Sequence, residues 1–409
     1  MAFPGQPDSI SAPATTSDGD SSGVIKVTWA EIVRLVDEHP ALVAGKFLVD
    51  AAREGVRVAG AVPNPTLEAT VGRGRARFGD FSRVERELAL SLPLGWIAQR
   101  RSGIDAAAAE TDIAVAEGKS LRRDVLLQLR TLFWNLVYEE ARVAALETLE
   151  AQTSKLVLTI KKRVEKGEVR PIEGIRVEIE LEKAMSELET ARTSLLSRRA
   201  QLALWTGVPD GRTIMAVADL SALPAAMDLD DALAKARTTH PALTAARART
   251  RSLEADVGTE KMARVPSLSI TGFTTDELDR RAYGIGLALD MPLWNWNSSR
   301  IAQSKAKLAA GRKQAEAIRL EIETTVIEVQ AACRASVAAA TRFRDNVVPR
   351  AETAASTIEK TYHFGEASLL EVIDARRTLL DSRRLYLSAL AQAQIDYGRL
   401  SALVGEELP

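Results

Sequence analysis

The sequence predicts a mainly α-helical protein with a small β part, formed by two copies of one unit: helix, β-hairpin, very long helix, turn and helix. Three observations lead to this fold class. Residues 65–94 and 266–293 alternate between apolar and polar residues, which is the period of a strand. No proline occurs between Pro93 and Pro171, where apolar residues recur at the three-four spacing of a helix. Landmarks of the first half also return in the second half at nearly constant spacing.

The repeat is visible on both sides of each hairpin. The tetrapeptide His-Pro-Ala-Leu occurs at residues 39–42 and again at residues 240–243, an offset of 201 (240 − 39). The prolines that open the hairpins, Pro65 and Pro266, have the same offset. After the hairpins the offset is 198 (365 − 167), and it relates two glycine pairs, Gly167 with Gly365 and Gly207 with Gly405. We therefore divide the chain into a disordered lead-in (1–28), a first repeat (29–207), a linker (208–228) and a second repeat (229–409).

Composition limits the function. The hydrophobic content of 46% and charged content of 27% are typical of an ordered protein, and a net charge of -1 gives no reason to expect a nucleic-acid partner. A single cysteine, Cys333, excludes an internal disulfide and a Cys-rich metal site. His39 and His240 each precede a proline at the same repeat position, which a turn between helical segments explains better than a metal site. We find no nucleophile–base pair, phosphate loop or metal cluster, so we expect no enzyme, no catalytic residue and no cofactor.

The hairpins hold the apolar surface that a membrane contact needs. No apolar run approaches the length of a membrane-spanning helix, so any contact with a bilayer must be made by strands. Each second arm keeps its large apolar residues on one face, the first with Val84, Leu88, Leu90, Leu92 and Leu94, the second with Tyr283, Ile285, Leu287, Leu289, Met291 and Leu293. Arg73, Arg75 and Arg77 continue the apolar parity of the first arm, and we place them at the tip, beyond the hydrocarbon.

A segment near the C-terminus carries a family resemblance. Residues 362–368, Tyr-His-Phe-Gly-Glu-Ala-Ser, followed by Leu-Glu-Val-Ile-Asp-Ala-Arg-Arg at 370–377, resemble the C-terminal motif of TolC-type outer membrane efflux proteins. His-Pro-Ala-Leu leading to Asn-Pro-Thr-Leu at residues 64–67 is most similar to the cobalt-zinc-cadmium (CzcC-like) branch of that family. The resemblance covers roughly residues 29 to 406.

The resemblance implies an outer membrane channel that is passive and trimeric. Each chain would contribute four strands to a twelve-stranded outer membrane β-barrel, and its long helices to a coiled-coil α-barrel across the periplasm. Such a duct serves a tripartite efflux (RND-type) or type I secretion system of a Gram-negative bacterium, together with a periplasmic adaptor and an inner membrane pump. Residues 1–23 show no signal peptide. A soluble coiled-coil scaffold with the same helices and no membrane insertion is the alternative, and the sequence does not specify the cargo.

Two sets of residues are candidates for the site. The resemblance implies that Glu371 and Asp374, a helical turn apart, line the periplasmic entrance, where threefold symmetry would gather six carboxylates and favour cations. An ordinary exposed helix face is the alternative for this pair. Trp96, Trp294 and Trp296 follow the second arms of the hairpins and suit an aromatic belt at the membrane interface.

Overall fold

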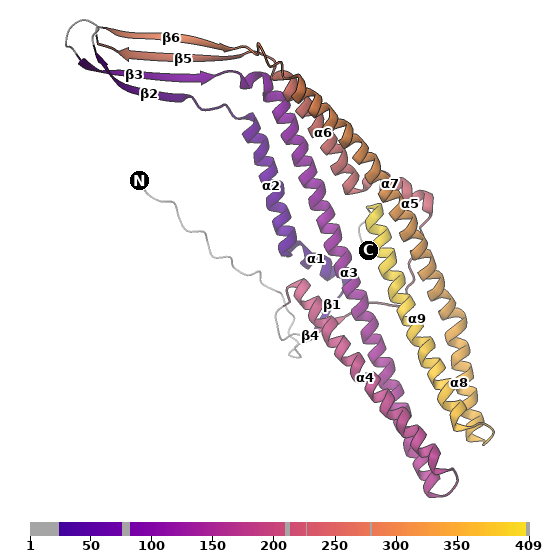
Figure 1. Ribbon diagram of the computed structural model, residues 1–409. Helices are drawn as coiled ribbons and strands as arrows, with labels where there is room; N and C mark the ends of the chain where they lie inside the picture. Colours follow the sequence, from indigo (N-terminus) through magenta and orange to yellow (C-terminus); the bar gives the residue numbers. More distant parts are fainter. Residues whose placement is uncertain (1–23, 76–81, 209–212, 226, 279, 406–409) are drawn as a thin grey trace.

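The protein is strongly elongated, with strands at one end and helical hairpins running to the other (Figure 1). The structure, a computed structural model, describes residues 24–75, 82–208, 213–225, 227–278 and 280–405. The Gly79-Asp80 turn and Arg77 lie outside these residues. Among the described residues, no helix combines the length and the apolar character that crossing a membrane requires.

The first repeat contains one β-hairpin with two α-helices before it and two after it. Its elements are α1 (Trp29–Leu35), a 3-10 turn (Val36–Glu38), α2 (Pro40–Gly60), β2 (Thr66–Arg75), β3 (Ser82–Pro93), α3 (Trp96–Glu165) and α4 (Pro171–Thr206). Helix α1 begins at a capping box in which Thr28 and Glu31 satisfy each other's backbone N–H groups. Prolines at the first position of α2 and α4 need no hydrogen-bond acceptor there, so they favour those starts. Helix α3 has 70 residues and is therefore roughly 105 Å long.

The second repeat follows the same order. Its elements are α5 (Leu229–Thr239), α6 (Pro241–Met262), β5 (Ser267–Asp276), β6 (Arg281–Asp290), α7 (Ser298–Arg342), a π-helical turn (Phe343–Val347), α8 (Val348–His363) and α9 (Leu369–Val404). The π-helical turn ends two residues before Pro349, which has no backbone N–H to donate to a regular α-helical hydrogen-bond ladder. The chain thus continues from α7 into α8 and reaches the same end of the molecule as α3 (Figure 1).

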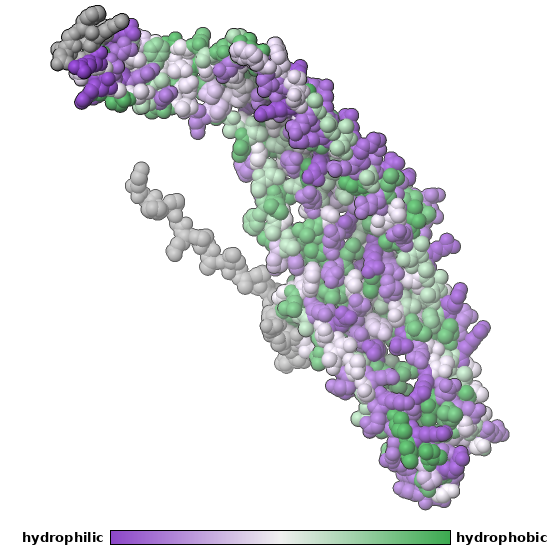
Figure 2. Space-filling view, viewed as in Figure 1, coloured by the Kyte–Doolittle hydropathy of each residue, from purple (hydrophilic) through white to green (hydrophobic). Residues whose placement is uncertain are grey.

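The two predicted hairpins are present and form one antiparallel sheet in the order β2-β3-β5-β6. The register places Leu67 opposite Leu90, and Leu92 opposite Ile270, so their apolar residues share one face of the sheet. Figure 2 shows hydrophobic residues along the strands and strongly hydrophilic residues at their far end. The outer edges of the sheet belong to β2 and β6.

The structure corrects one part of the sequence prediction: residues 24–27 of the expected disordered lead-in form a strand. The linker at residues 208–228 also contains a short strand, which the sequence analysis does not identify. β1 (Val24–Val27) and β4 (Thr213–Ala216) pair in parallel, with Ile25 opposite Ile214. Four-residue strands give too short an alternation to be seen in the sequence, and their pairing depends on a partner almost 190 residues away. Val27 and Ile214 are buried in the main core, which explains the order of both segments.

The main core lies where this small sheet meets α1, α3 and α4. Phe133, Leu129 and Leu136 of α3 are fully buried there, each stabilising the fold by about 1.5–3 kcal/mol. Arg130 is also buried: its Nε donates to the carbonyl oxygen of Gln394 on α9 at 3.2 Å, and its guanidinium lies 5.5 Å from the centre of the Trp29 ring. Burial lowers the pKa of Arg130 to about 10. This contact joins the first repeat to the last helix.

Candidate functional site at the helical tips

Two helical hairpins end at the pole of the molecule opposite the strands (Figure 1). In each, the chain reverses through a glycine with positive φ, +71° at Gly167 and +81° at Gly365. The Glu168 N–H donates to the Arg163 carbonyl at 2.8 Å, and the Glu366 N–H donates to the Thr361 carbonyl at 2.9 Å. This is the Schellman ending, in which a left-handed residue lets the chain satisfy the last carbonyls of the helix. The repeated glycines in the sequence therefore mark equivalent turns.

Glu371 lies in the first turn of α9, directly after the Gly365 turn. Its Oε2 accepts a hydrogen bond from the Ser368 N–H at 2.6 Å and from the Ser368 hydroxyl at 2.9 Å, while the Ser368 Oγ accepts from the Glu371 N–H. These bonds, that to the backbone N–H foremost, lower the pKa of Glu371. Glu371 is therefore a charged residue that also caps the helix, which the sequence analysis did not anticipate.

Asp374 lies one turn further along α9 and is exposed. Within the described part of the chain it makes no hydrogen bond or ion pair, so its carboxylate faces solvent. The exposed faces of Glu371 and Asp374 place two negative charges close to the tip.

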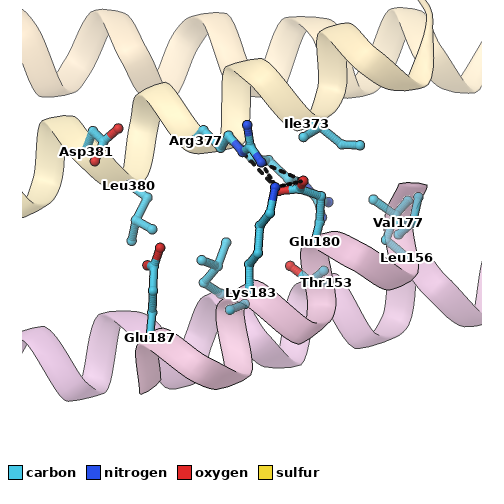
Figure 3. Close-up of a pocket in the computed structure, with 13 residues that line it drawn as sticks. Thr153, Leu156, Val177, Glu180, Lys183, Glu187, Ile373, Arg377, Leu380 and Asp381 are labelled. Atoms are coloured by element: carbon cyan, nitrogen blue, oxygen red, sulfur yellow. Dashed lines mark hydrogen bonds and ion pairs between the residues drawn. The ribbon is translucent and has the colours of Figure 1, made fainter. Parts of the chain in front are cut away.

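Sequence reasoning missed a link between the two helical hairpins (Figure 3). Arg377 of α9 reaches Glu180 of α4, with Nε 2.9 Å from Oε2 and the terminal nitrogen 2.5 Å from both carboxylate oxygens. Lys183 binds the same carboxylate at 3.2 Å. Burial alone would raise the pKa of Glu180, but the hydrogen bonds and charges of Arg377 and Lys183 outweigh burial and lower it. The three side chains border a cavity of about 190 Å³ between α3, α4 and α9.

Two further arginines of α9, Arg376 and Arg383, form ion pairs with α8. Arg376 is 19% exposed and its Nε lies 2.6 Å from Glu359 of α8. Arg383 binds Glu352 of α8 at 2.7 Å. Both therefore connect the two helices of one hairpin. The partners lie 17 and 31 residues away, so no local spacing could have identified them.

The three tryptophans lie where the sheet joins the helices, but in different surroundings. Trp294 and Trp296 are 93% and 59% exposed in the segment between β6 and α7. Trp96 begins α3, is half-buried, and has the guanidinium of Arg100 5.4 Å from its ring centre. The Arg264 Nε donates to the Trp296 carbonyl at 2.8 Å, which fixes this segment to the end of α6.

The two histidines occupy turns, as their sequence context predicted. His39 and His240 each cap the helix that follows, with Nδ1 accepting the N–H of Ala41 at 3.3 Å and of Ala242 at 3.2 Å. His240 is buried, and its Nε2 lies 2.8 Å from Arg123. Burial, with the charge of Arg123, lowers the pKa of His240 to about 4. Across the described residues, no group of three or more His, Cys, Asp or Glu side chains is placed to hold a metal ion.

Comparison with known proteins agrees with this architecture. The model of the outer membrane efflux protein family matches residues 32–208 and 232–406. The cobalt-zinc-cadmium resistance protein CzcC of Cupriavidus metallidurans is 26% identical over 347 residues, covering 84% of this chain and 81% of that protein. Among solved structures, VceC of Vibrio cholerae superposes with a TM-score of 0.75 at 17% identity, over 93% of this chain and 97% of VceC. The MtrE channel of Neisseria gonorrhoeae superposes with a TM-score of 0.76 at 17% identity, over 93% of this chain and 89% of MtrE. This chain belongs to the outer membrane efflux protein family.

Proposed function

We propose that this chain is one subunit of a passive, trimeric exit duct in the outer membrane of a Gram-negative bacterium. The observation that carries the proposal is the four-stranded sheet, which has an apolar face and two unpaired edges, β2 and β6, at one end of very long helices. Unpaired strand edges are not tolerated in lipid, so a sheet of four strands must close with copies of itself. Three copies give the twelve-stranded barrel that the family resemblance implies.

The helices then serve as the periplasmic part of the duct. Residues 29–207 and 229–409 act as two repeats that together supply one third of an α-barrel. An outer membrane duct has no energy source, so we infer a periplasmic adaptor and an inner membrane pump as partners. The exposed Trp294 and Trp296, next to the sheet, support a membrane boundary at that level, with the half-buried Trp96 anchoring the start of α3.

At the opposite pole, Glu371 and Asp374 would ring the entrance. Both are exposed, and the low pKa of Glu371 keeps it charged. Six carboxylates around a threefold axis would attract cations and repel anions. CzcC is named for resistance to cobalt, zinc and cadmium. Divalent metal cations are therefore the cargo that we would examine first.

Two measurements test the duct. The mass of the protein purified in detergent should correspond to three chains, and its addition to a planar bilayer should produce steady conductance steps. A monomer that stays soluble without detergent and produces no conductance would favour a scaffold without membrane insertion. Growth of a deletion strain in cobalt, zinc and cadmium salts, with and without the gene, then tests the cargo.

A further inference from the structure

The outward face of the sheet changes character at the end remote from the helices. On β2, Arg73 follows Leu67, Ala69 and Val71 on the same face, and on β3, Arg86 precedes Leu88 and Leu90. The register pairs Val71 with Arg86, so Arg73 lies diagonally next to Arg86, about 7–8 Å away. Arg281 occupies the same level on β6, since Arg86 is opposite Asp276 and Asp276 is opposite Arg281.

We call Arg73, Arg86 and Arg281 the arginine row. Their positive charge exceeds the negative charge of the carboxylates described next to them. Arg73 and Arg86 are exposed and, among the residues that the structure describes, have no hydrogen bond or ion pair. Arg281 is 80% exposed and lies 3.4 Å from Asp276. The same Asp276 carboxylate also lies 3.5 Å from Arg83. One negative charge is therefore already shared by Arg83 and Arg281, and Arg73 and Arg86 add two further positive charges. The row therefore presents uncompensated guanidinium groups on the apolar face.

The row lies where lipid head groups would begin. Tyr283, two residues from Arg281 and on the same face, is 92% exposed, and Ile285, Leu287 and Leu289 follow it toward the helices. Tyrosine prefers the membrane interface, where its ring lies in the apolar region and its hydroxyl in water. An outward arginine is strongly destabilising at the bilayer midplane and is tolerated near the interface. The apolar band, the tyrosine and the arginines thus follow one another in the order expected at a membrane boundary.

We propose that the arginine row binds the phosphate groups of an anionic lipid in the outer leaflet. This inference rests on the proposed function, because it requires the sheet to be in a membrane. Guanidinium groups bind phosphate oxygens through paired N–H donors. Two arginines about 7–8 Å apart can therefore bind the phosphates of one head group or of two adjacent head groups. The apolar residues below the row would contact the acyl chains of the same lipid. A lipid with exposed phosphate monoesters fits both parts of this surface, whereas free phosphate fits only one.

The test compares lipid retention by the whole purified protein. Protein in detergent is mixed with lipid A, which carries two phosphate monoesters, and bound lipid is counted by native mass spectrometry. We expect the unaltered trimer to retain lipid A and the double variant Arg73→Gln, Arg86→Gln to retain about tenfold less, because glutamine cannot form charge-assisted hydrogen bonds to phosphate oxygens. Arg249→Gln with Arg350→Gln, two exposed arginines on α6 and α8, is the matched control and should bind as the unaltered protein.

The outcomes separate this inference from the duct itself. Equal retention of dephosphorylated lipid A, or displacement of the lipid by millimolar inorganic phosphate, would overturn the lipid-phosphate site. Equal binding by the arginine variant would overturn it as well. Trimer mass and conductance are measured on the same samples. If the unaltered protein neither trimerises nor conducts, the proposed function fails; if it does both but binds lipid A without regard to phosphate, only the arginine row is reassigned.

Discussion

Arg377 of α9 and Glu180 of α4 form a three-contact ion pair that joins the helical hairpin of the second repeat to that of the first. The partners are 197 residues apart in sequence. Their helices run to the tip without a loop that joins them (Figure 1). We expect this contact to limit how far the two hairpins separate near the proposed entrance.

We predict that the pair couples the two hairpins in a salt- and pH-dependent way. A double-mutant cycle of Glu180→Gln and Arg377→Gln, followed by denaturant unfolding, should give a coupling of ~0.2–1 kcal/mol at low salt and less at high salt. The folded-state pKa of Glu180 is lowered, so the coupling should be complete above the unfolded pKa and disappear as pH falls through the folded pKa. Each variant should also speed amide exchange at the start of α9. A coupling of zero at low salt and neutral pH would mean that the pair is incidental.

The acidic residues at the tip should set ion selectivity. Glu371→Gln with Asp374→Asn removes both charges, while Gln at position 371 can still take part in the capping box with Ser368. We expect the cation-to-anion permeability ratio in planar bilayers to fall roughly threefold to tenfold, with the trimer intact. Glu316→Gln with Asp50→Asn makes the same chemical changes away from the tip and should leave the ratio unaltered. An unchanged ratio in the tip variant would remove the selectivity role, and loss of the trimer would show that the pair is structural.

Gly398 should be intolerant of a side chain. A Cβ at this position would overlap the buried side chain of Arg130, which is held by Gln394 and stacked on Trp29. Gly398→Ala should therefore destabilise the protein by about 1–3 kcal/mol in denaturant unfolding. Gly103→Ala on α3 is the matched control: nothing lies within 4 Å of its Cβ, and a helical alanine should stabilise by about 0.5–1 kcal/mol. Equal stability of the two variants would contradict this account of the Arg130 contact.

His240 should make the protein acid-sensitive. Its folded-state pKa of about 4 lies below the unfolded value of 6.5, so the unfolded chain binds more protons between these values. The part of the free energy of unfolding that depends on His240 has its full value above pH 6.5. It decreases as pH drops toward 4, by on the order of 3 kcal/mol. His240→Asn, which keeps a capping side chain, should reduce the loss measured by urea unfolding between pH 7.5 and pH 4.5. His39→Asn alters the matching cap of the first repeat; if it protects as well as His240→Asn, burial beside Arg123 is not the cause.

The sequence determined the features that depend on local pattern. Alternation gave both hairpins, and the absence of proline from the segment before Pro171 gave a helix that the structure bounds at Trp96 and Glu165. The repeated glycines marked equivalent turns because only glycine adopts positive φ without strain. The family followed from the motif at residues 362–377, and the family model matches both halves of the chain.

Tertiary structure decided everything that depends on which distant residues meet. The pairing of β1 with β4, the link between Glu180 and Arg377, and the placement of Arg130 over Gly398 each join segments more than 180 residues apart. An isolated helix shows a charged or small residue only as a position on its surface, so the sequence could not tell a solvated Arg376 from one bound to Glu359. The capping role of Glu371 is a different case: the Ser-x-x-Glu spacing at residues 368–371 is a capping-box signal in the sequence, and the structure shows the hydrogen bonds that it forms.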